Sequence, residues 1–155
     1  LIYAQADSLG VDIRTSINDG TALDEFRKMC IRQGVKQSDI DNMIQDPWSI
    51  LPRAQHHTEI VAKKSGYVSQ IHALTIGEIL CKLGAGRTGE NPDIDHGVGA
   101  ELLVMRGEYI EAGKPWIRFD SEDELSQETI DQIQLSLSTT ETEVEFSSRI
   151  LEIIQ

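Results

Sequence analysis

The stretch that decides the fold is Gly66–Trp116, GYVSQIHALTIGEILCKLGAGRTGENPDIDHGVGAELLVMRGEYIEAGKPW, which holds nine of the chain's twelve glycines. These glycines stand singly or in pairs between apolar runs, so they mark turns and close backbone approaches rather than a linker. Short apolar segments predict β-strands at Tyr67–Ile71, Ala100–Met105 and Pro115–Phe119. A helical pattern at Thr75–Leu83 lies between the first two strands, and the polar loop Gly84–Gly99 follows it.

Two pairs of turn signals predict hairpins. The turn Lys63–Gly66 is expected to join a strand at Glu59–Ala62 to the strand at Tyr67–Ile71. Gly107 and Gly113 bracket five residues and predict a second hairpin with tight turns.

The predicted central helix has a clear start, face and stop. Thr75 and Glu78 have capping-box spacing, and Gly84 is expected to end the helix. Its apolar positions share one face: Ile76, Ile79, Leu80 and Leu83.

Further helices are predicted on both sides of this unit. One is expected at Thr15–Gly34, with Asp19 or Thr21 capping its main part and Gly34 as its stop, and a shorter one at Ser38–Ile44 with Ser38 as cap. Asp46-Pro47 ends the second helix, because the residue before a proline avoids the α region.

Towards the C-terminus, Ser126–Leu137 predicts a helix, and Glu143–Ile153 is either β-rich or helical. The fold class is therefore α+β, with a barrel-like or sandwich β-core from about Glu59 to Phe119 that one helix crosses. Trp48 and Trp116 are expected to fill the core or a seam between domains.

Composition excludes several functions. The chain has 155 residues and a formal net charge of −12, which argues against a nucleic-acid-binding face. No apolar run approaches the length of a membrane span, and the N-terminus lacks the features of a signal peptide. It also lacks an initiator Met, which suggests a fragment. Cys30 and Cys81 are interpreted as small buried hydrophobes in a reducing compartment.

Ordered sequence blocks point to a known family. Leu83–Arg87 (LGAGR), followed by Asp93-x-Asp95-x-x-Val98-Gly99, resembles the C-terminal domain of thymidine and pyrimidine-nucleoside phosphorylases. Asn18–Met29, which contains D-G-T-A-L-x-x-F, also resembles a helix of that family, and the match extends over roughly residues 15–120. The order and spacing of the blocks make this resemblance specific.

The resemblance implies a hammerhead-type α+β domain at residues 53–155, preceded by a helical segment, residues 1–52, of the parent α/β domain. It implies a pentosyltransferase reaction in the parent, in which thymidine and phosphate give thymine and 2-deoxyribose 1-phosphate. The parent is expected to be a cytoplasmic homodimer with phosphate as co-substrate and no cofactor. The expected partners are the rest of that chain and a pyrimidine nucleoside, with no membrane contact. The family's phosphate loop and base-reading block do not occur in this sequence, so no catalytic residue is assigned and the fragment is not expected to turn over nucleosides alone.

The loop Gly84–Gly99 is the candidate contribution to function. Its site residues are Gly84, Gly86, Arg87, Asp93 and Asp95. In one interpretation the loop closes over the substrate cleft, and Arg87 faces phosphate or a domain partner. In the other, the glycines and Arg87 cap the helix, and Arg87 pairs with Asp93 or Asp95. Both interpretations remain open at this point.

A second class of function is a carrier or binding module of the biotinyl or lipoyl type. That hypothesis places Lys63 or Lys64 at a hairpin tip, where the lysine would be modified. Metal binding is disfavoured: His56 and His57 are adjacent on a predicted strand and point to opposite faces, and His96 with Asp93 and Asp95 lacks a fourth ligand.

Overall fold

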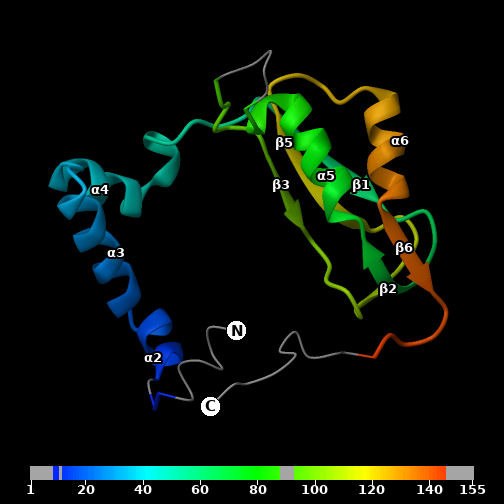
Figure 1. The fold of residues 1–155 in the computed structure, drawn as a ribbon, viewed down its shortest axis with the longest axis horizontal. Helices are drawn as coiled ribbons and strands as arrows, with labels where there is room; N and C mark the ends of the chain where they lie inside the picture. Colours follow the sequence, from blue (N-terminus) through cyan, green and yellow to red (C-terminus); the bar gives the residue numbers. More distant parts are fainter. Residues whose placement is uncertain (1–8, 11, 88–92, 146–155) are drawn as a thin grey trace. The chain divides into compact units, whose positions relative to one another are not determined.

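The computed structural model describes residues 9–10, 12–87 and 93–145 (Figure 1). The chain forms two compact units, and the boundary between them lies after Leu51.

The first unit is helical. Its elements are α2 (Ile13–Asn18), α3 (Thr21–Arg32), α4 (Gln37–Gln45) and a 3₁₀ turn at Pro47–Ser49. The prediction of one continuous helix over Thr15–Gly34 is wrong, because Gly20 takes a left-handed conformation (φ 89°) and separates α2 from α3. The N-cap of α3 is Gly20, so the cap predicted at Asp19 or Thr21 is wrong, although Asp19 Oδ1 accepts a hydrogen bond from Thr21 N at 2.9 Å. Gly34, with φ 96°, follows the end of α3 as predicted.

The cap predicted for α4 is also wrong. The helix begins at Gln37 with Lys36 as N-cap, so Ser38 lies inside the first turn. Its hydroxyl donates to Asp39 Oδ1 at 3.2 Å and accepts no capping bond from the backbone N–H of any described residue. The predicted stop is confirmed, because Asp46 before Pro47 is the C-cap with extended φ and ψ angles of −144° and 88°.

The second unit is α+β, as predicted, but it is not a closed barrel. Its elements are β1 (His56–Val61), β2 (Gly66–Ile71), α5 (Ala73–Leu80), a π-helical turn (Cys81–Ala85), β3 (Gly99–Leu102), β4 (Tyr109–Ile110), β5 (Pro115–Ser121), α6 (Gln127–Leu135) and β6 (Leu137–Thr140). They form two antiparallel three-stranded sheets, β1-β5-β3 and β4-β2-β6. Helix α5 lies between β2 and β3 in the chain, as the sequence indicates (Figure 1).

Neither predicted hairpin forms. β1 pairs with β5, whereas β2 pairs with β4 and β6, so the segment between Ala62 and Gly66 passes from one sheet to the other. The backbone of Ala62 bonds instead to the Gly113–Lys114 turn, with N–O distances of 2.9 and 2.8 Å. Gly107 and Gly113 do turn the chain with positive φ, but the strand between them pairs with β2.

Each of the two helices in this unit agrees with the sequence at one end only. α5 begins at Ala73, so the capping box at Thr75 is wrong; the Thr75 hydroxyl lies 2.8 Å from His72 Nδ1. Gly84 ends the helical stretch with φ 118°, as predicted. Ser126 caps α6 through a bond from Thr129 N, but Leu137, expected in the helix, begins β6.

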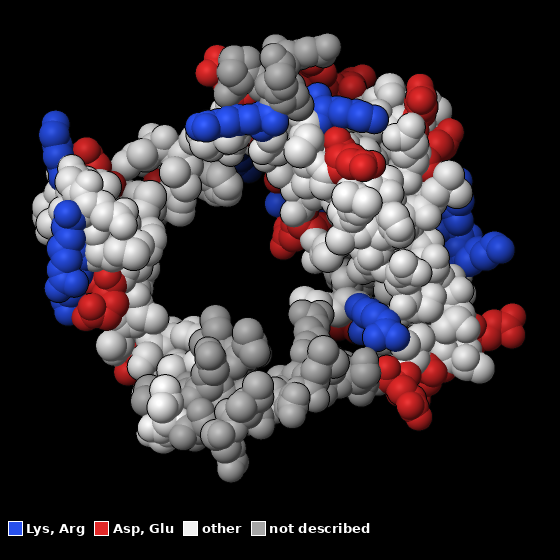
Figure 2. Space-filling view, in the orientation of Figure 1, with Lys and Arg blue, Asp and Glu red and all other residues white. Residues whose placement is uncertain are grey.

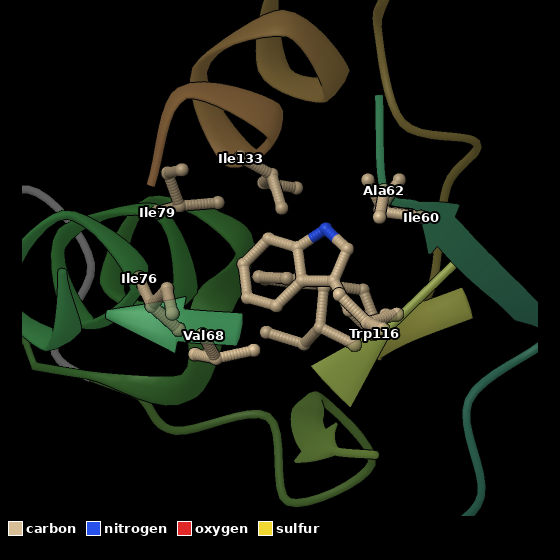
Figure 3. Close-up of a cluster of buried hydrophobic side chains, with 10 residues drawn as sticks. Ile60, Ala62, Val68, Ile76, Ile79, Trp116 and Ile133 are labelled. Carbon is tan, nitrogen blue, oxygen red and sulfur yellow. The ribbon is translucent and has the colours of Figure 1, made fainter. Parts of the chain in front are cut away.

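The core of the second unit surrounds Trp116. Trp116, Ile117, Phe119, Val68 and Ile133 have no exposed surface. Figure 3 shows the indole of Trp116 enclosed by isoleucine and valine side chains from the strands, α5 and α6. The predicted apolar face of α5 is confirmed, since Ile76 and Ile79 join this cluster.

Three further expectations have mixed outcomes. Cys81 is exposed and Cys30 half-buried, so the prediction that both are buried hydrophobes is wrong for Cys81. Trp116 lies in the core, but Trp48 is 59% exposed. Of the C-terminal tail, residues 143–145 have no regular structure, and the rest lies outside the described residues.

Candidate functional site

The two ends of the loop at Gly84–Gly99 are tied to each other. Asp95 N donates to Gly84 O at 2.9 Å, and Asp95 Oδ1 accepts from Gly97 N at 2.8 Å. Gly84 is buried, has φ 118°, and a Cβ there would lie 3.2 Å from the Cβ of Asp95. The spacing from Gly84 to Asp95 therefore has a structural reason. Gly84, where the helix ends, and Asp95, near the C-terminal end of the loop, are joined by a backbone hydrogen bond.

Close packing holds the same junction against other parts of the unit. A Cβ at Gly86 would collide with Cys81 Sγ, and one at Gly97 would lie 3.0 Å from Ala54 N. A side chain at either position would force these sulfur or backbone atoms to shift, so the close packing favours glycine. The base of the loop is thus anchored both to the preceding helix and to the segment that leads into β1.

Of the three charged candidates, only Asp95 belongs to this junction. Arg87 and Asp93 are exposed, and Asp95 is half-buried. Over the ranges that the structure describes, no ion pair joins Arg87 to Asp93 or Asp95. Gly84 does end the helix. The Asp95 carboxylate, however, accepts a hydrogen bond from the backbone N–H of Gly97 and is not a partner of Arg87.

A cluster of charged side chains on sheet β1-β5-β3 was missed from the sequence. His57 Nδ1 lies 2.7 Å from Asp120 Oδ1, Arg118 Nε donates to the same oxygen at 3.1 Å, and Arg118 Nη2 lies 3.1 Å from Glu101 Oε2. Cross-strand register places these groups on one face, because His57 pairs with Asp120 and Glu101 with Arg118. Only the register reveals the cluster, since its members come from three strands.

Asp120 is the shared acceptor of this cluster. Burial by itself raises the pKa of Asp120, but the hydrogen bonds from His57 and Arg118, together with their positive charges, outweigh that effect and hold the pKa below its ordinary value of 3.8. A carboxylate whose pKa is depressed by folding stabilises the folded state while it is ionised.

We therefore expect Asp120→Asn to lower the free energy of unfolding by about 1 kcal/mol at neutral pH. Because the folded-state pKa lies below 3.8, this contribution is present above that pH and is lost as the pH falls through the folded-state value. Urea unfolding of both proteins between pH 7 and pH 3 would measure the difference, which should shrink towards acid. The matched control is Asp123→Asn, since Asp123 is exposed and its side chain makes no contact with the cluster. An equal, pH-independent loss in both variants would contradict the role given to Asp120.

The remaining candidates do not converge on a site. Within the described ranges, no group of three or more His, Cys, Asp or Glu residues is arranged to hold a metal ion. Lys63 and Lys64 lie on the crossing between two sheets rather than at a hairpin tip, so the geometric premise of the carrier hypothesis is wrong. On the face shown in Figure 2, basic side chains lie in small separate groups with acidic ones among them. The described part of the chain holds no helix that is both long and apolar enough to cross a bilayer.

The fold and the loop define a small α+β domain that carries an anchored surface loop. Residues 67–139 match the family model described as the pyrimidine nucleoside phosphorylase C-terminal domain. Human thymidine phosphorylase is 34% identical over 110 residues, which are 68% of this chain and 23% of the relative. The rat thymidine phosphorylase gives the same values. A pyrimidine-nucleoside phosphorylase of Staphylococcus aureus is 32% identical over 123 residues, 79% of this chain and 27% of the relative.

The chain belongs to this phosphorylase family and contains its C-terminal domain. The predicted resemblance is confirmed. The chain spans about a quarter of the length of these curated relatives.

Proposed function

We propose that the chain serves as the C-terminal part of a phosphorylase that cleaves thymidine or a related pyrimidine nucleoside with phosphate. In this role the second unit, in a hammerhead-type arrangement, stabilises the α/β body of the parent and presents the anchored loop at the rim of its cleft. The parent is proposed to be a cytoplasmic homodimer that uses no cofactor. The observation that carries the proposal is the surface of the first unit.

That unit has an uncovered apolar face. Leu23, Phe26 and Met29 recur every three residues along α3 and are 46%, 39% and 45% exposed. Of its described residues, only Ile40 is a buried hydrophobic. Helices obtain most of their stability from packing an apolar face, and an exposed patch of this kind marks an interaction surface. The relatives extend well beyond the matched region, so we propose that the α/β body of the parent covers this face.

The proposal predicts a clear difference in activity. This chain alone is expected to release no thymine from thymidine and phosphate, whereas a longer polypeptide that carries the same sequence after the α/β part should release it only when phosphate is present. Product analysis by liquid chromatography would measure both. Turnover by the chain alone, or none by the longer polypeptide with any pyrimidine nucleoside, would overturn the proposal.

The loop is proposed to act through Arg87, which is exposed and follows the buried Gly84 by three residues. We expect Arg87→Gln in the longer polypeptide to raise the KM for phosphate about tenfold or more, because a charge-assisted hydrogen bond contributes about 1.5–3 kcal/mol. The matched control is Arg106→Gln. Arg106 also carries a positive charge, but its Nε donates to Ser69 O of strand β2. An unchanged KM for phosphate in the Arg87 variant would remove Arg87, and with it Asp93 and Asp95, from the cleft.

A further inference from the structure

A groove runs along β6 beside the C-terminal end of α6. It consists of two cavities of about 420 and 390 Å³, and Leu135 and Ser138 belong to the walls of both. The larger cavity, named here the β6 cavity, is also lined by Lys63, Lys64 and Trp116. The β6 cavity lies on the second unit. None of the described residues that line it belongs to the junction of the candidate loop.

The charge of the groove is opposite to that of the protein. The chain has 26 Asp and Glu residues and a net charge of −12. Nevertheless, the described residues that line the two cavities include two lysines and one histidine but no acidic side chain. Lys63 and Lys64 are exposed, and neither forms an ion pair with a described residue. An acidic protein that keeps carboxylates out of one cavity and places two ammonium groups at it favours an anionic occupant there.

The wall of the β6 cavity also contains a buried hydrogen-bond donor that the protein does not use. Trp116 is fully buried, and its Nε1–H has no partner among the described residues. In Figure 3 the ring nitrogen points towards the space between Ile133 of α6 and Ala62 at the end of β1. Ala62 belongs to the wall of the β6 cavity. A buried donor without an acceptor costs about 1–3 kcal/mol, and this donor belongs to a residue in the wall of the cavity.

The lysines are held on a rigid support. Ala62 exchanges two backbone hydrogen bonds with Gly113 and Lys114, and Ser65 Oγ accepts from Ala112 N at 2.8 Å. The two residues between these anchors, Lys63 and Lys64, therefore have a fixed backbone. Such preorganisation reduces the entropy that a ligand must offset when it binds.

We propose that the β6 cavity binds a small organic anion that carries a short apolar chain. The negative charge faces Lys63 and Lys64, and the ligand lies over the wall to which the buried Trp116 belongs. The apolar chain lies against Leu135 and Leu137, which complete the wall. A carboxylate and a phosphate monoester share this chemistry.

The test uses the indole N–H as its own reporter. In a Trp48→Phe background, Trp116 supplies the only indole resonance, and Trp48 is exposed enough to be replaced without disturbing the core. Titration with hexanoate or hexyl phosphate, followed by ¹H–¹⁵N NMR, should shift this resonance and reach saturation. The neutral probe hexanol should bind about tenfold more weakly or not at all. The anion that binds with the higher affinity identifies the head group, carboxylate or phosphate monoester.

Substitution of the lysines separates a charged site from an apolar cavity. Lys63→Gln with Lys64→Gln should weaken binding of the anions about tenfold or more and leave hexanol unaffected. Lys36→Gln with Lys82→Gln removes the same charge outside the cavity and should change nothing. The proposal is overturned if neither anion saturates the shift, which is the result expected when water alone fills the cavity. It is also overturned if all three probes bind equally, or if both double variants behave alike. The readout is binding to this chain, so the outcome is independent of phosphorolysis.

Discussion

Replacing Trp116 with alanine is expected to lower the free energy of unfolding of the second unit by about 4 kcal/mol, the range found when a large aromatic residue is removed from a core. Trp116 has no exposed surface and joins both sheets to α5 and α6 through one apolar cluster. Domains of this size are stable by only about 5–15 kcal/mol, so the loss would remove much of the total. The substitution both reduces the apolar surface that folding buries and leaves a cavity that rigid neighbours fill incompletely.

The measurement is urea unfolding followed by far-ultraviolet circular dichroism, with thermal unfolding as a second probe. The matched control is Trp48→Ala, which removes the same side chain from a position that is 59% exposed. We expect a change of less than about 1 kcal/mol there. Similar losses in the two variants would show that Trp116 is not the centre of the core.

The second large effect is expected for Gly66→Ala. Gly66 opens β2 with φ 154°, and a Cβ added there would lie 2.7 Å from Thr140 O in the neighbouring strand β6. A backbone oxygen cannot move away as a flexible side chain can, so β2 and β6 must separate locally. We expect a loss of about 2–3 kcal/mol from this overpacking and the strained φ angle.

The same substitution at Gly77 should have the opposite sign. Gly77 lies inside α5, and a Cβ there would meet no atom within 4 Å. Because alanine is the better helix former by about 0.8–1 kcal/mol, Gly77→Ala should stabilise the unit slightly. Unfolding curves would compare the two variants, and amide hydrogen exchange along β2 and β6, which pair in the register Val68 with Thr139, would locate the damage. If Gly66→Ala left the free energy of unfolding unchanged, the strands would have to be packed less closely than the structure shows.

Helix ends and turns could be predicted because their causes are local. Gly34 and Gly84 follow helices with positive φ, and Asp46 ends α4 before Pro47. The family could be recognised for the same reason, since its signature is a row of such turns at regular spacing. Helix starts were less certain, because Thr75 and Ser38 have the composition of caps but bond to neighbouring side chains instead.

Strand partners could not be predicted in this way. The turn predicted at Lys63–Gly66 is a bend at Lys63 and Lys64, and the strands on its two sides pair with segments that lie far away in the chain. A turn fixes the direction of the backbone over a few residues, but apolar packing across the whole unit selects which strands meet. The cluster around Asp120 follows from that selection, since His57 and Asp120 are 63 residues apart.

The sequence by itself determined the α+β class, the family, the helix between β2 and β3, and the positions where only glycine turns the chain. These features depend on φ angles, periodicity and composition, which act within a short stretch. The tertiary structure alone decided that there are two open sheets, that Asp95 closes the loop onto Gly84, and that Lys63, Lys64 and Trp116 meet at one cavity. Contacts of this kind are selected by the free energy of the whole packed core, in which many distant side chains share one volume, and no short segment contains that information.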